Sequence, residues 1–331
     1  MGVALAACGE APPAAPDVPL PERGVVALGV EGDVRRIAHP FGVTETPFYP
    51  RRIVSLGGAD ELLLLGVRPV AHTLFFGDFR EYLRPHLEGV MPIGTAYGGF
   101  QPDVEAIYRA RPDLILAGPF SGIGYDQLRR IAPTVPLTPM RPLADWERTL
   151  DSLHQVAAVL GREERARTVE AAFRRKAAKA RELLYARGRQ HETVATVRVH
   201  ARRFRMNGRP QGGGPILYDL LGLRAPDVIR TNHWAKRAPL LMLTPEKMLG
   251  LEIEHLFVIV DPTLGNDNAM RAMEENAVWQ RIPAVRRGHV YRVHFGAWQG
   301  GDLLGQEQII DDVVTALTGE TLPRILDGDV E

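Results

Sequence analysis

The side chains best suited to binding chemistry in this sequence are cationic and aromatic, and they gather in five short segments. Guanidinium groups bind carboxylate, hydroxamate or catecholate oxygens, and aromatic faces pack against rings and chains. Together these groups favour an acidic ligand that carries planar rings. The candidate contacts are Arg198, Arg202, Arg203, Arg205, Trp234, Lys236, Arg237, Trp298, Phe75, Phe76 and Tyr97.

Arg198 gives the clearest signal in this set. Its neighbours Val197 and Val199 point to the other face of an expected strand, so Arg198 shares a face with His200. An arginine within a strand needs a charge partner or an anionic ligand, because burying an unpaired charge is costly. For any single member of the set, a solvated basic loop or a core aromatic is the alternative interpretation.

Enzyme signatures are missing from the sequence. It contains no Gly-x-Ser-x-Gly, no phosphate loop ending in Gly-Lys-Ser/Thr and no His-Glu-x-x-His. The glycines at 212–214 precede an expected helix, so a backbone anion nest is conceivable, although a flexible turn is favoured. We therefore expect no enzyme, no catalytic residue and no cofactor. A cytosolic α/β enzyme that binds a phosphate at this turn is the rival from a different class.

A resident metal ion is not expected either. Several histidines and one aspartate fall near the ends of expected strands, where they could hold manganese or zinc. Each histidine stands alone, however, without a partner at helical ligand spacing, which is more typical of a hydrogen-bonded structural residue. These residues are His72, His200, His233, His294 and Asp261.

The elements that must position these side chains alternate between strands and helices. An apolar strand at 51–56 leads through a small-residue turn into a helix closed by Gly66, and a helix at 103–107 leads into a strand at 114–117. Such alternation builds a parallel sheet, and ligands lie at the carboxyl ends of its strands. We predict an α/β fold with two Rossmann-like lobes, each built on a parallel central sheet.

Further segments complete the two lobes. Short strands are expected at 69–73 and 131–136 in the first lobe, with a turn at 93–95, and at 194–199, 256–261 and 290–295 in the second. A small hairpin is expected at 25–37, and helices at 217–223 and 309–317. Between the lobes, residues 145–187 carry an apolar stripe at helical spacing that Gly161 interrupts, so two helices or one kinked helix would fit.

Composition limits the partners of the chain. Its 331 residues can bury the cores of two lobes, and 40 basic residues balance 40 acidic ones. A net charge near zero argues against nucleic acid as a partner. No apolar run reaches the roughly 20 residues that a transmembrane helix needs. We expect a monomer.

The single cysteine suggests a lipid anchor. Leu5-Ala6-Ala7-Cys8 matches a bacterial lipobox, and the proline-rich segment 10–21 that follows suits an extended tether. Cys8 is therefore the expected lipidation site, which puts the chain outside the cytoplasm and holds it to the membrane by its anchor alone. Only seven residues precede Cys8, with no basic region. Either the natural start lies upstream of Met1, or the match is chance and Cys8 lies in an unpacked tail.

Six motifs along the chain resemble those of the cluster III solute-binding proteins of ABC importers, the group that carries ferric siderophores, haem and cobalamin. The likeness covers most of residues 25–318. The motifs are Arg52-Ile53-Val54-Ser55-Leu56, Pro102-Asp103-Val104-Glu105-Ala106-Ile107, Arg111-Pro112-Asp113-Leu114-Ile115, Thr244-Pro245-Glu246-Lys247-Met248-Leu249, Trp279-Gln280-Arg281-Ile282-Pro283-Ala284-Val285 and Gly288-His289-Val290-Tyr291.

The resemblance implies a single long helix that bridges the lobes, little closure on binding, and a ferric siderophore held between the lobes and delivered to an ABC permease. By position in the motifs, Glu105 and Glu246 look like the residues that dock into arginine pockets of the permease. Their alternative role is that of ordinary acids in the first turn of a helix. Haem, cobalamin or a bare metal ion are the alternative ligands.

The expected organisation has four parts. Residues 1–24 form the lipobox and tether, 25–144 the N-terminal lobe, 145–188 the inter-lobe backbone helix, and 189–331 the C-terminal lobe.

Overall fold

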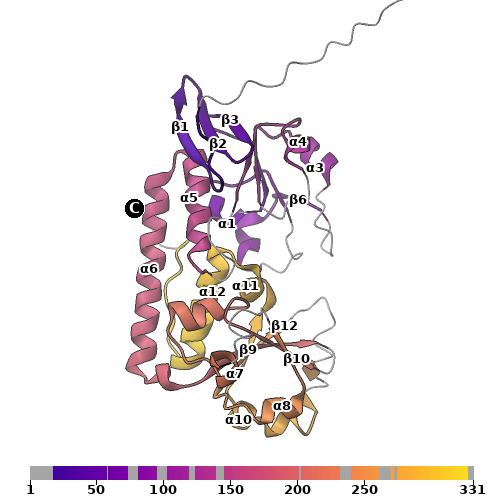
Figure 1. Ribbon diagram of the computed structural model, residues 1–331, viewed down its shortest axis with the longest axis vertical. Helices are drawn as coiled ribbons and strands as arrows, with labels where there is room; N and C mark the ends of the chain where they lie inside the picture. The colour runs from indigo at the N-terminus through magenta and orange to yellow at the C-terminus, as the bar shows by residue number, and fades with distance from the viewer. Residues whose placement is uncertain are drawn as a thin grey trace, which may run out of the picture.

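The fold comes from a computed structural model of the chain. It describes residues 18–57, 59–73, 81–94, 103–118, 124–138, 145–200, 203–231, 240–260, 270–271 and 274–326. Two α/β lobes lie one above the other, and a long helix runs along their common side (Figure 1). In these ranges no helix combines the length and the apolar character that crossing a membrane requires.

The sheet of the N-terminal lobe is parallel and runs in the order β6-β5-β4-β7-β8. Every residue of β4 and β7 is buried, as expected for central strands that helices cover on both faces. The winding direction switches between these two strands, and ligands of open α/β sheets bind at such a switch point. The strands are β4 (Ile53–Leu56), β5 (Ala71–Thr73), β6 (Met91–Ile93), β7 (Leu114–Ala117) and β8 (Thr134–Pro136).

Short helices cover this sheet, and the proline-bearing strands β6 and β8 are its edges. The helices are α1 (Ala59–Leu64), α2 (Arg84–Leu87), α3 (Val104–Arg109) and α4 (Tyr125–Leu128), with a 3-10 turn at Glu81–Leu83 before α2.

A small antiparallel sheet sits on top of the N-terminal lobe and consists of β1 (Val26–Glu31), β2 (Val34–His39) and β3 (Gly42–Pro47). Only its first hairpin was expected from the sequence. The inward positions of β3 hold Thr44 and Thr46, both buried, which weakens the apolar alternation. The hydroxyl of Thr44 donates to the carbonyl of Thr134, so this polar strand is tied to the lobe beneath it.

The sheet of the C-terminal lobe is mixed and runs in the order β11-β10-β9-β12-β13. Strands β9, β12 and β13 are parallel, but β10 and β11 are antiparallel to their neighbours. This corrects the expectation of a fully parallel second sheet. The residues between β9 and β10 are too few for the crossover that a parallel pair needs. The strands are β9 (Val194–His200), β10 (Arg203–Asn207), β11 (Leu240–Leu243), β12 (His255–Val260) and β13 (Val290–His294).

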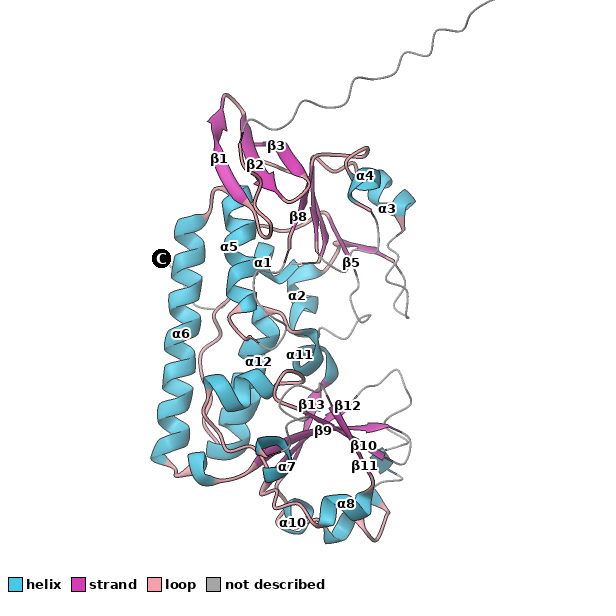
Figure 2. Ribbon diagram, in the orientation of Figure 1, coloured by secondary structure: helices cyan, strands magenta, loops and turns pink. Residues whose placement is uncertain are grey.

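The helices of this lobe lie on both sides of the mixed sheet (Figure 2). The segment expected as a helix at 217–223 is a π-helical segment at Pro215–Leu220. The others are α7 (Asp227–Arg230), α8 (Pro245–Leu249), α10 (Pro283–Arg286), α11 (Phe295–Gly300) and α12 (Leu303–Thr318), with 3-10 turns at Arg189–His191 and Trp279–Arg281.

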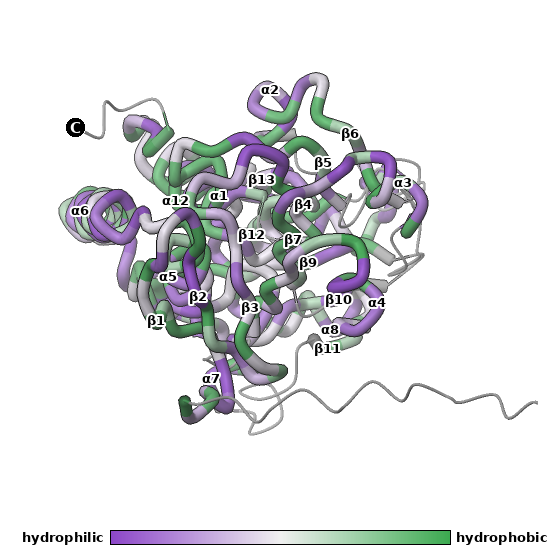
Figure 3. The backbone as a smooth tube through the Cα atoms, turned by 90° about the horizontal axis from the view of Figure 1, so that it is seen from above, coloured by the Kyte–Doolittle hydropathy of each residue, from purple (hydrophilic) through white to green (hydrophobic). Residues whose placement is uncertain are grey.

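Two helices, and not one, occupy the segment between the lobes. Helix α5 (Arg148–Leu160) ends at Gly161, which has a left-handed φ of 66°. A second helix, α6 (Glu163–Ala186), begins two residues later. The break confirms the two-helix alternative for 145–187 that the apolar stripe allowed, and corrects the single helix that the family resemblance implied for 145–188. Helix α6 alone, 24 residues long, runs along both lobes (Figure 1). Hydrophobic residues concentrate on the central strands, and hydrophilic stretches mark α6 and α3 at the periphery (Figure 3).

The first turn of α12 joins the two lobes a second time. Its backbone N–H at Leu303 donates to Oδ2 of Asp60 on α1 at 2.9 Å. The hydroxyl of Tyr82 donates to both carboxylate oxygens of Asp302, at 2.9 and 2.7 Å. Asp302 also caps α12 by accepting from the N–H of Gly305. The beginning of α12 is therefore fixed by carboxylates to the elements that follow the N-terminal strands.

A buried lysine fixes α12 to the bridging helix. Nζ of Lys176 on α6 lies 2.6 Å from Oε1 of Glu307 and 2.8 Å from Oδ1 of Asp311. The same ammonium donates to the carbonyl of Pro323, and Oε1 of Glu307 accepts from the N–H of Ile325. Each charge of this cluster is thus paired, which a buried ion needs in order to be tolerated.

The corner between α5 and α6 gives a first prediction. A Cβ on Gly161 would lie 2.1 Å from Nη2 of Arg35, whose guanidinium is buried and lies 5.0 Å from the Phe48 ring. Gly161→Ala should therefore destabilise the chain by about 2–3 kcal/mol through left-handed strain and displacement of this guanidinium. Urea unfolding measures the effect.

Gly188→Ala is the matched control, because Gly188 has a φ of 73° with open space around it. We expect this variant to lose about 1 kcal/mol of unfolding free energy. Equal losses in the two variants would contradict the packing of Arg35 on this corner.

Asp311 gives a second prediction. Burial raises the pKa of its carboxyl from 3.8 to about 6, against the opposing effect of Lys176. The folded state then holds a proton that the unfolded state releases at lower pH, so this contribution to stability is present in acid and is lost as the pH rises through about 6. The free energy of unfolding of Asp311→Asn, relative to the native chain, should rise by about 2 kcal/mol between pH 4.5 and 7.5. Urea titrations across this range test it, and a constant difference would contradict the shifted pKa.

Candidate ligand site

The carboxyl ends of the two sheets face each other. Helix α1 directly follows β4, and α11 and α12 directly follow β13. These two groups of elements are in contact through Asp60 with Leu303 and through Tyr82 with Asp302. Because the contact joins what comes after the strand ends of both sheets, the space beside it is where a parallel α/β fold offers a ligand site.

Two arginines lie side by side at this end of the C-terminal sheet. Arg198 on β9 is directly opposite Arg205 on β10, and opposite residues of an antiparallel pair project from the same face. Both side chains are half-buried. The guanidinium of Arg198 lies 5.2 Å from the centre of the Phe295 ring, a cation–π distance. The structure thus brings together two of the arginines that the sequence singled out and adds Phe295 to them.

The arginine pair lies next to hydrogen-bond donors that have no acceptor within the described residues. Nε of Arg205 is buried without a hydrogen-bond partner there, and so is Nε2 of Gln299 on α11. Gln299 was missed because the sequence favoured a loop at 295–301. The spacing of Phe295 and Gln299, four residues apart, is the helical signal that could have found it.

The glycines at 212–214 pack close to this site. The carbonyl of Gly212 accepts from the hydroxyl of Thr196 at 3.1 Å and from Nδ2 of Asn207 at 3.5 Å. A Cβ on Gly213, whose φ is 81°, would lie 2.7 Å from the Trp298 ring. These contacts give the turn a packing role. They lend no support to a phosphate nest.

Trp298 lies in the core and does not face a ligand. Its side chain is 1% exposed and stacks on Phe257 with the ring centres 5.0 Å apart. Its indole N–H donates to Oδ2 of Asp312 at 2.7 Å, and burial raises the pKa of that carboxyl. The sequence placed Trp298 on a loop, but α11 turns it inward. We therefore remove it from the candidate ligand contacts.

The remaining expected contacts cannot be placed. They lie outside the described residues, apart from Arg203, whose backbone belongs to β10 but whose side chain is not described. They stay predictions, as does lipidation of Cys8. These residues are Arg202, Trp234, Lys236, Arg237, Phe75, Phe76 and Tyr97.

The two expected docking glutamates are exposed at the starts of short helices. Glu105 opens α3, which Asp103 caps by accepting from two backbone N–H groups. Glu246 opens α8, which Thr244 caps. Hydrogen bonds from its own backbone N–H and from the Thr244 hydroxyl lower the pKa of Glu246. Helices α3 and α8 belong to different lobes, and both lie on the side of the molecule away from α6 (Figure 1).

The described part of the chain shows no metal centre, since no group of three or more His, Cys, Asp or Glu side chains in it could hold an ion. Nδ1 of His72 lies 3.2 Å from the carbonyl of Thr73. His233 and Asp261 fall outside the described residues, and the side chain of His200 is not described.

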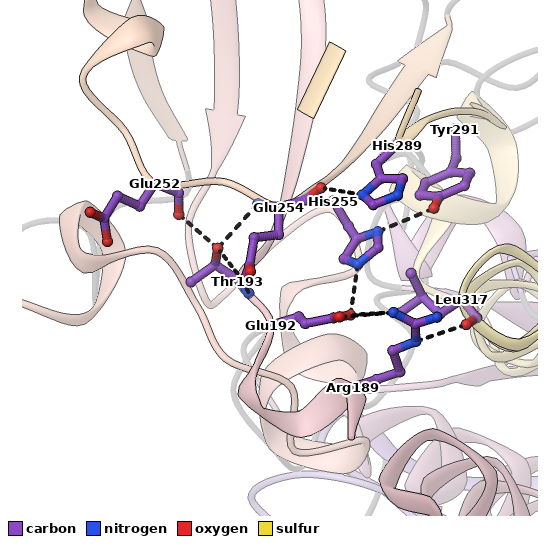
Figure 4. Close-up of polar contacts among 9 residues, drawn as sticks. All are labelled: Arg189, Glu192, Thr193, Glu252, Glu254, His255, His289, Tyr291 and Leu317. Carbon is purple, nitrogen blue, oxygen red and sulfur yellow. Dashed lines mark hydrogen bonds and ion pairs between the residues drawn. The ribbon is translucent and has the colours of Figure 1, made fainter. Parts of the chain in front are cut away.

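A buried polar cluster lies at the opposite, amino ends of the C-terminal strands (Figure 4). Nε2 of His255 lies 2.7 Å from Oε2 of Glu192, and its Nδ1 lies 3.1 Å from the Tyr291 hydroxyl. Arg189 donates to Glu192 and also to the carbonyl of Leu317 at the end of α12. Burial lowers the pKa of His255. Both ring nitrogens of this histidine are used within the protein, so the cluster clamps the base of the lobe.

A hollow of about 580 Å³ lies along the edge strand β13, against α12 and residues 321–324. Its carboxylates already have partners, since Asp312 accepts from Trp298 and Gln308, and Asp311 accepts from Lys176. The hollow is therefore a weaker candidate for the ligand site than the strand ends.

Comparisons with known proteins agree with a binding role. A model of a family described as periplasmic binding protein matches residues 94–296. YxeB of Bacillus subtilis (strain 168), an iron(3+)-hydroxamate-binding protein, is 24% identical over 86% of this chain and 85% of its own length. YhfQ of the same organism, named as an ABC transporter substrate-binding lipoprotein, is 27% identical over 79% of this chain and 81% of its own.

A solved structure supports the fold. Staphylococcus aureus SirA complexed with staphyloferrin B superimposes with a TM-score of 0.66 at 24% identity, covering 85% of this chain and 98% of SirA. The family model spans more than half of the sequence. The chain therefore belongs to the periplasmic binding protein family, whose members are substrate-binding transport proteins and not enzymes.

Proposed function

We propose that this chain captures an anionic ferric siderophore between its two lobes and delivers it to an ABC permease. The observation that carries the proposal is the pair Arg198 and Arg205, opposite each other on one half-buried sheet face at the carboxyl end of β9. Like charges directly opposite each other destabilise a sheet. A bound anion offsets that cost, and the fork of a guanidinium fits carboxylate or catecholate oxygens.

The surroundings of the pair suit such a chelate. Phe295 offers an aromatic ring beside Arg198, and Nε of Arg205 has no acceptor among the described residues. Relatives named for iron(3+)-hydroxamate binding and a solved neighbour holding staphyloferrin B support iron chelates as the ligand class. The two arginines of the site further indicate that the chelate is negatively charged. Haem, cobalamin or a bare metal ion gain no comparable support.

The location and the partner complete the proposal. The lipobox at Cys8 would anchor the chain outside the cytoplasm, in the manner that the name of YhfQ describes for that protein. Glu105 and Glu246, exposed on the same side of the two lobes, would each meet a basic pocket of the permease. The double attachment of the lobes, through α6 and through the first turn of α12, favours a small closure on binding.

Replacing either arginine of the pair tests the ligand site. Arg198→Ala or Arg205→Ala should weaken binding of ferric citrate by about 1.5–3 kcal/mol, roughly tenfold to a hundredfold, because a charge-assisted hydrogen bond is lost. Binding of the cationic ferrioxamine B should not weaken. Titration of tryptophan fluorescence measures both.

The control for this test is Arg292→Ala. Arg292 lies on β13 of the same sheet and pairs with Glu274, but it projects from the opposite face. The Arg292→Ala variant should leave the affinity for ferric citrate unchanged. Unchanged binding by both Arg198→Ala and Arg205→Ala would remove the pair from the site.

The docking assignment makes a separate prediction. The double variant Glu105→Ala/Glu246→Ala should bind the chelate like the native chain but lose uptake by tenfold or more, because interfacial charge pairs contribute roughly 1.5–7 kcal/mol. Uptake of the iron-55 chelate into cells measures this. Glu164→Ala/Glu182→Ala removes two exposed glutamates of α6 and should transport normally. Normal uptake by the first double variant would refute the docking role.

A further inference from the structure

Gln299 shares a helical face with a residue of the ligand site. It lies on α11, four residues after Phe295, and positions i and i+4 of a helix are neighbours on one face. The ring of Phe295 lies 5.2 Å from the guanidinium of Arg198. The face of α11 that carries Gln299 is therefore the face turned toward the arginine pair.

The amide oxygen of Gln299 has a hydrogen-bond partner, but its amide nitrogen has none among the described residues. Its Oε1 accepts from Nε2 of Gln211 at 3.4 Å, which leaves Nε2 as the group available for a new bond. That Nε2 lies 2.7 Å from the position that a Cβ on Gly212 would take, so Gly212 lets it approach the turn. The nearby carbonyl of Gly212 already accepts from Thr196 and Asn207.

The amide lies one row deeper than the guanidinium groups. Thr196 and Asn207 precede Arg198 and follow Arg205 by two residues, so they project from the same sheet face as the arginines. Two residues along a strand correspond to roughly 6.5–7 Å. Gly212 covers the Thr196–Asn207 row, and Gln299 lies against Gly212. A ligand that reaches past the arginine pair toward this row would come to the amide next.

Two donors of different chemistry thus have no acceptor among the described residues, namely Nε of Arg205 and Nε2 of Gln299. Leaving a buried donor unpaired is costly, so an acceptor from the ligand is the simplest way to satisfy each one. Ligand oxygens bound to iron(III) have already given lone pairs to the metal. A carboxylate outside the iron coordination sphere keeps both oxygens as strong acceptors.

We propose that Gln299 is a ligand-binding residue whose amide nitrogen donates to a pendant carboxylate arm of the chelate. The inference rests on the proposed function and narrows it to ferric chelates that carry a free carboxylate. The arginine pair supplies the attraction for negative charge. Gln299, a neutral donor, distinguishes a free carboxylate from a negative charge that is shared among iron-bound oxygens.

The test compares two probes and two variants. Native chain, Gln299→Leu and Gln299→Glu are titrated with ferric citrate, which has free carboxylates, and with ferrioxamine B, which has none. Gln299→Leu should weaken ferric citrate binding about tenfold, because one hydrogen bond is lost. Gln299→Glu should weaken it further through charge repulsion. Neither variant should change binding of ferrioxamine B, if the native chain binds it at all.

Gln280→Leu is the matched control, since Gln280 is exposed in the 3-10 turn at Trp279–Arg281 and donates to the Glu274 carbonyl, away from the arginine pair. Thermal melting of each variant separates loss of binding from loss of folding, and Gln299→Glu keeps the size of the side chain if Gln299→Leu melts early.

Ferric citrate binding that is equal in the native chain and both Gln299 variants overturns the inference and leaves the proposed function standing. Binding of ferrioxamine B alone also overturns it. A native chain that binds neither chelate removes the proposed function and this inference with it.

Discussion

The placement of two positive charges opposite each other on one sheet face is the constraint on which the site depends. Arg198 and Arg205 meet because β9 and β10 form a tight antiparallel pair within a lobe that is otherwise wound in parallel. If the strand at the position of β10 ran parallel to β9, a residue other than Arg205 would lie beside Arg198. The mixed sheet, which departs from a simple doubly wound lobe, is therefore the feature that concentrates positive charge at the strand ends.

A site between two lobes depends on how the lobes are held together. Helices α6 and α12 make this connection. Helix α6 runs along both lobes, and Lys176 attaches it to α12 through Glu307 and Asp311. The start of α12 is held by Asp60 and by Tyr82 through Asp302. Charged groups thus fix α12 at its start and along its first half. These directional contacts resist sliding of the packed helices more than an apolar interface would, which supports the proposal that the lobes close little on binding.

The sequence predicted the central strands because short apolar runs such as 114–117 and 256–260 favour buried strands. It predicted the family through the six motifs that resemble it. It missed β10, because the arginines of the alternating Arg203-Phe204-Arg205-Met206 pattern were grouped with Arg198 as a cluster at the end of the preceding strand. It misplaced Trp298 because a large aromatic in a glycine-rich stretch fits a loop and a buried helix equally well. Gln299 left only its four-residue spacing from Phe295 as a signal, since its other contacts are with residues far away in the chain.

The two buried polar clusters of the C-terminal lobe differ in a way that identifies the functional one. At the amino ends of the strands, His255 has both ring nitrogens engaged by Glu192 and Tyr291, and burial lowers its pKa. At the carboxyl ends, Arg205 and Gln299 keep donors that no described residue accepts. Polar groups that are paired within the protein contribute to stability, whereas unpaired buried donors are candidates for a ligand contact. The unmatched donors lie at the end where parallel sheets bind their ligands, which supports the proposal of an anionic ligand there and a structural role for the histidine cluster.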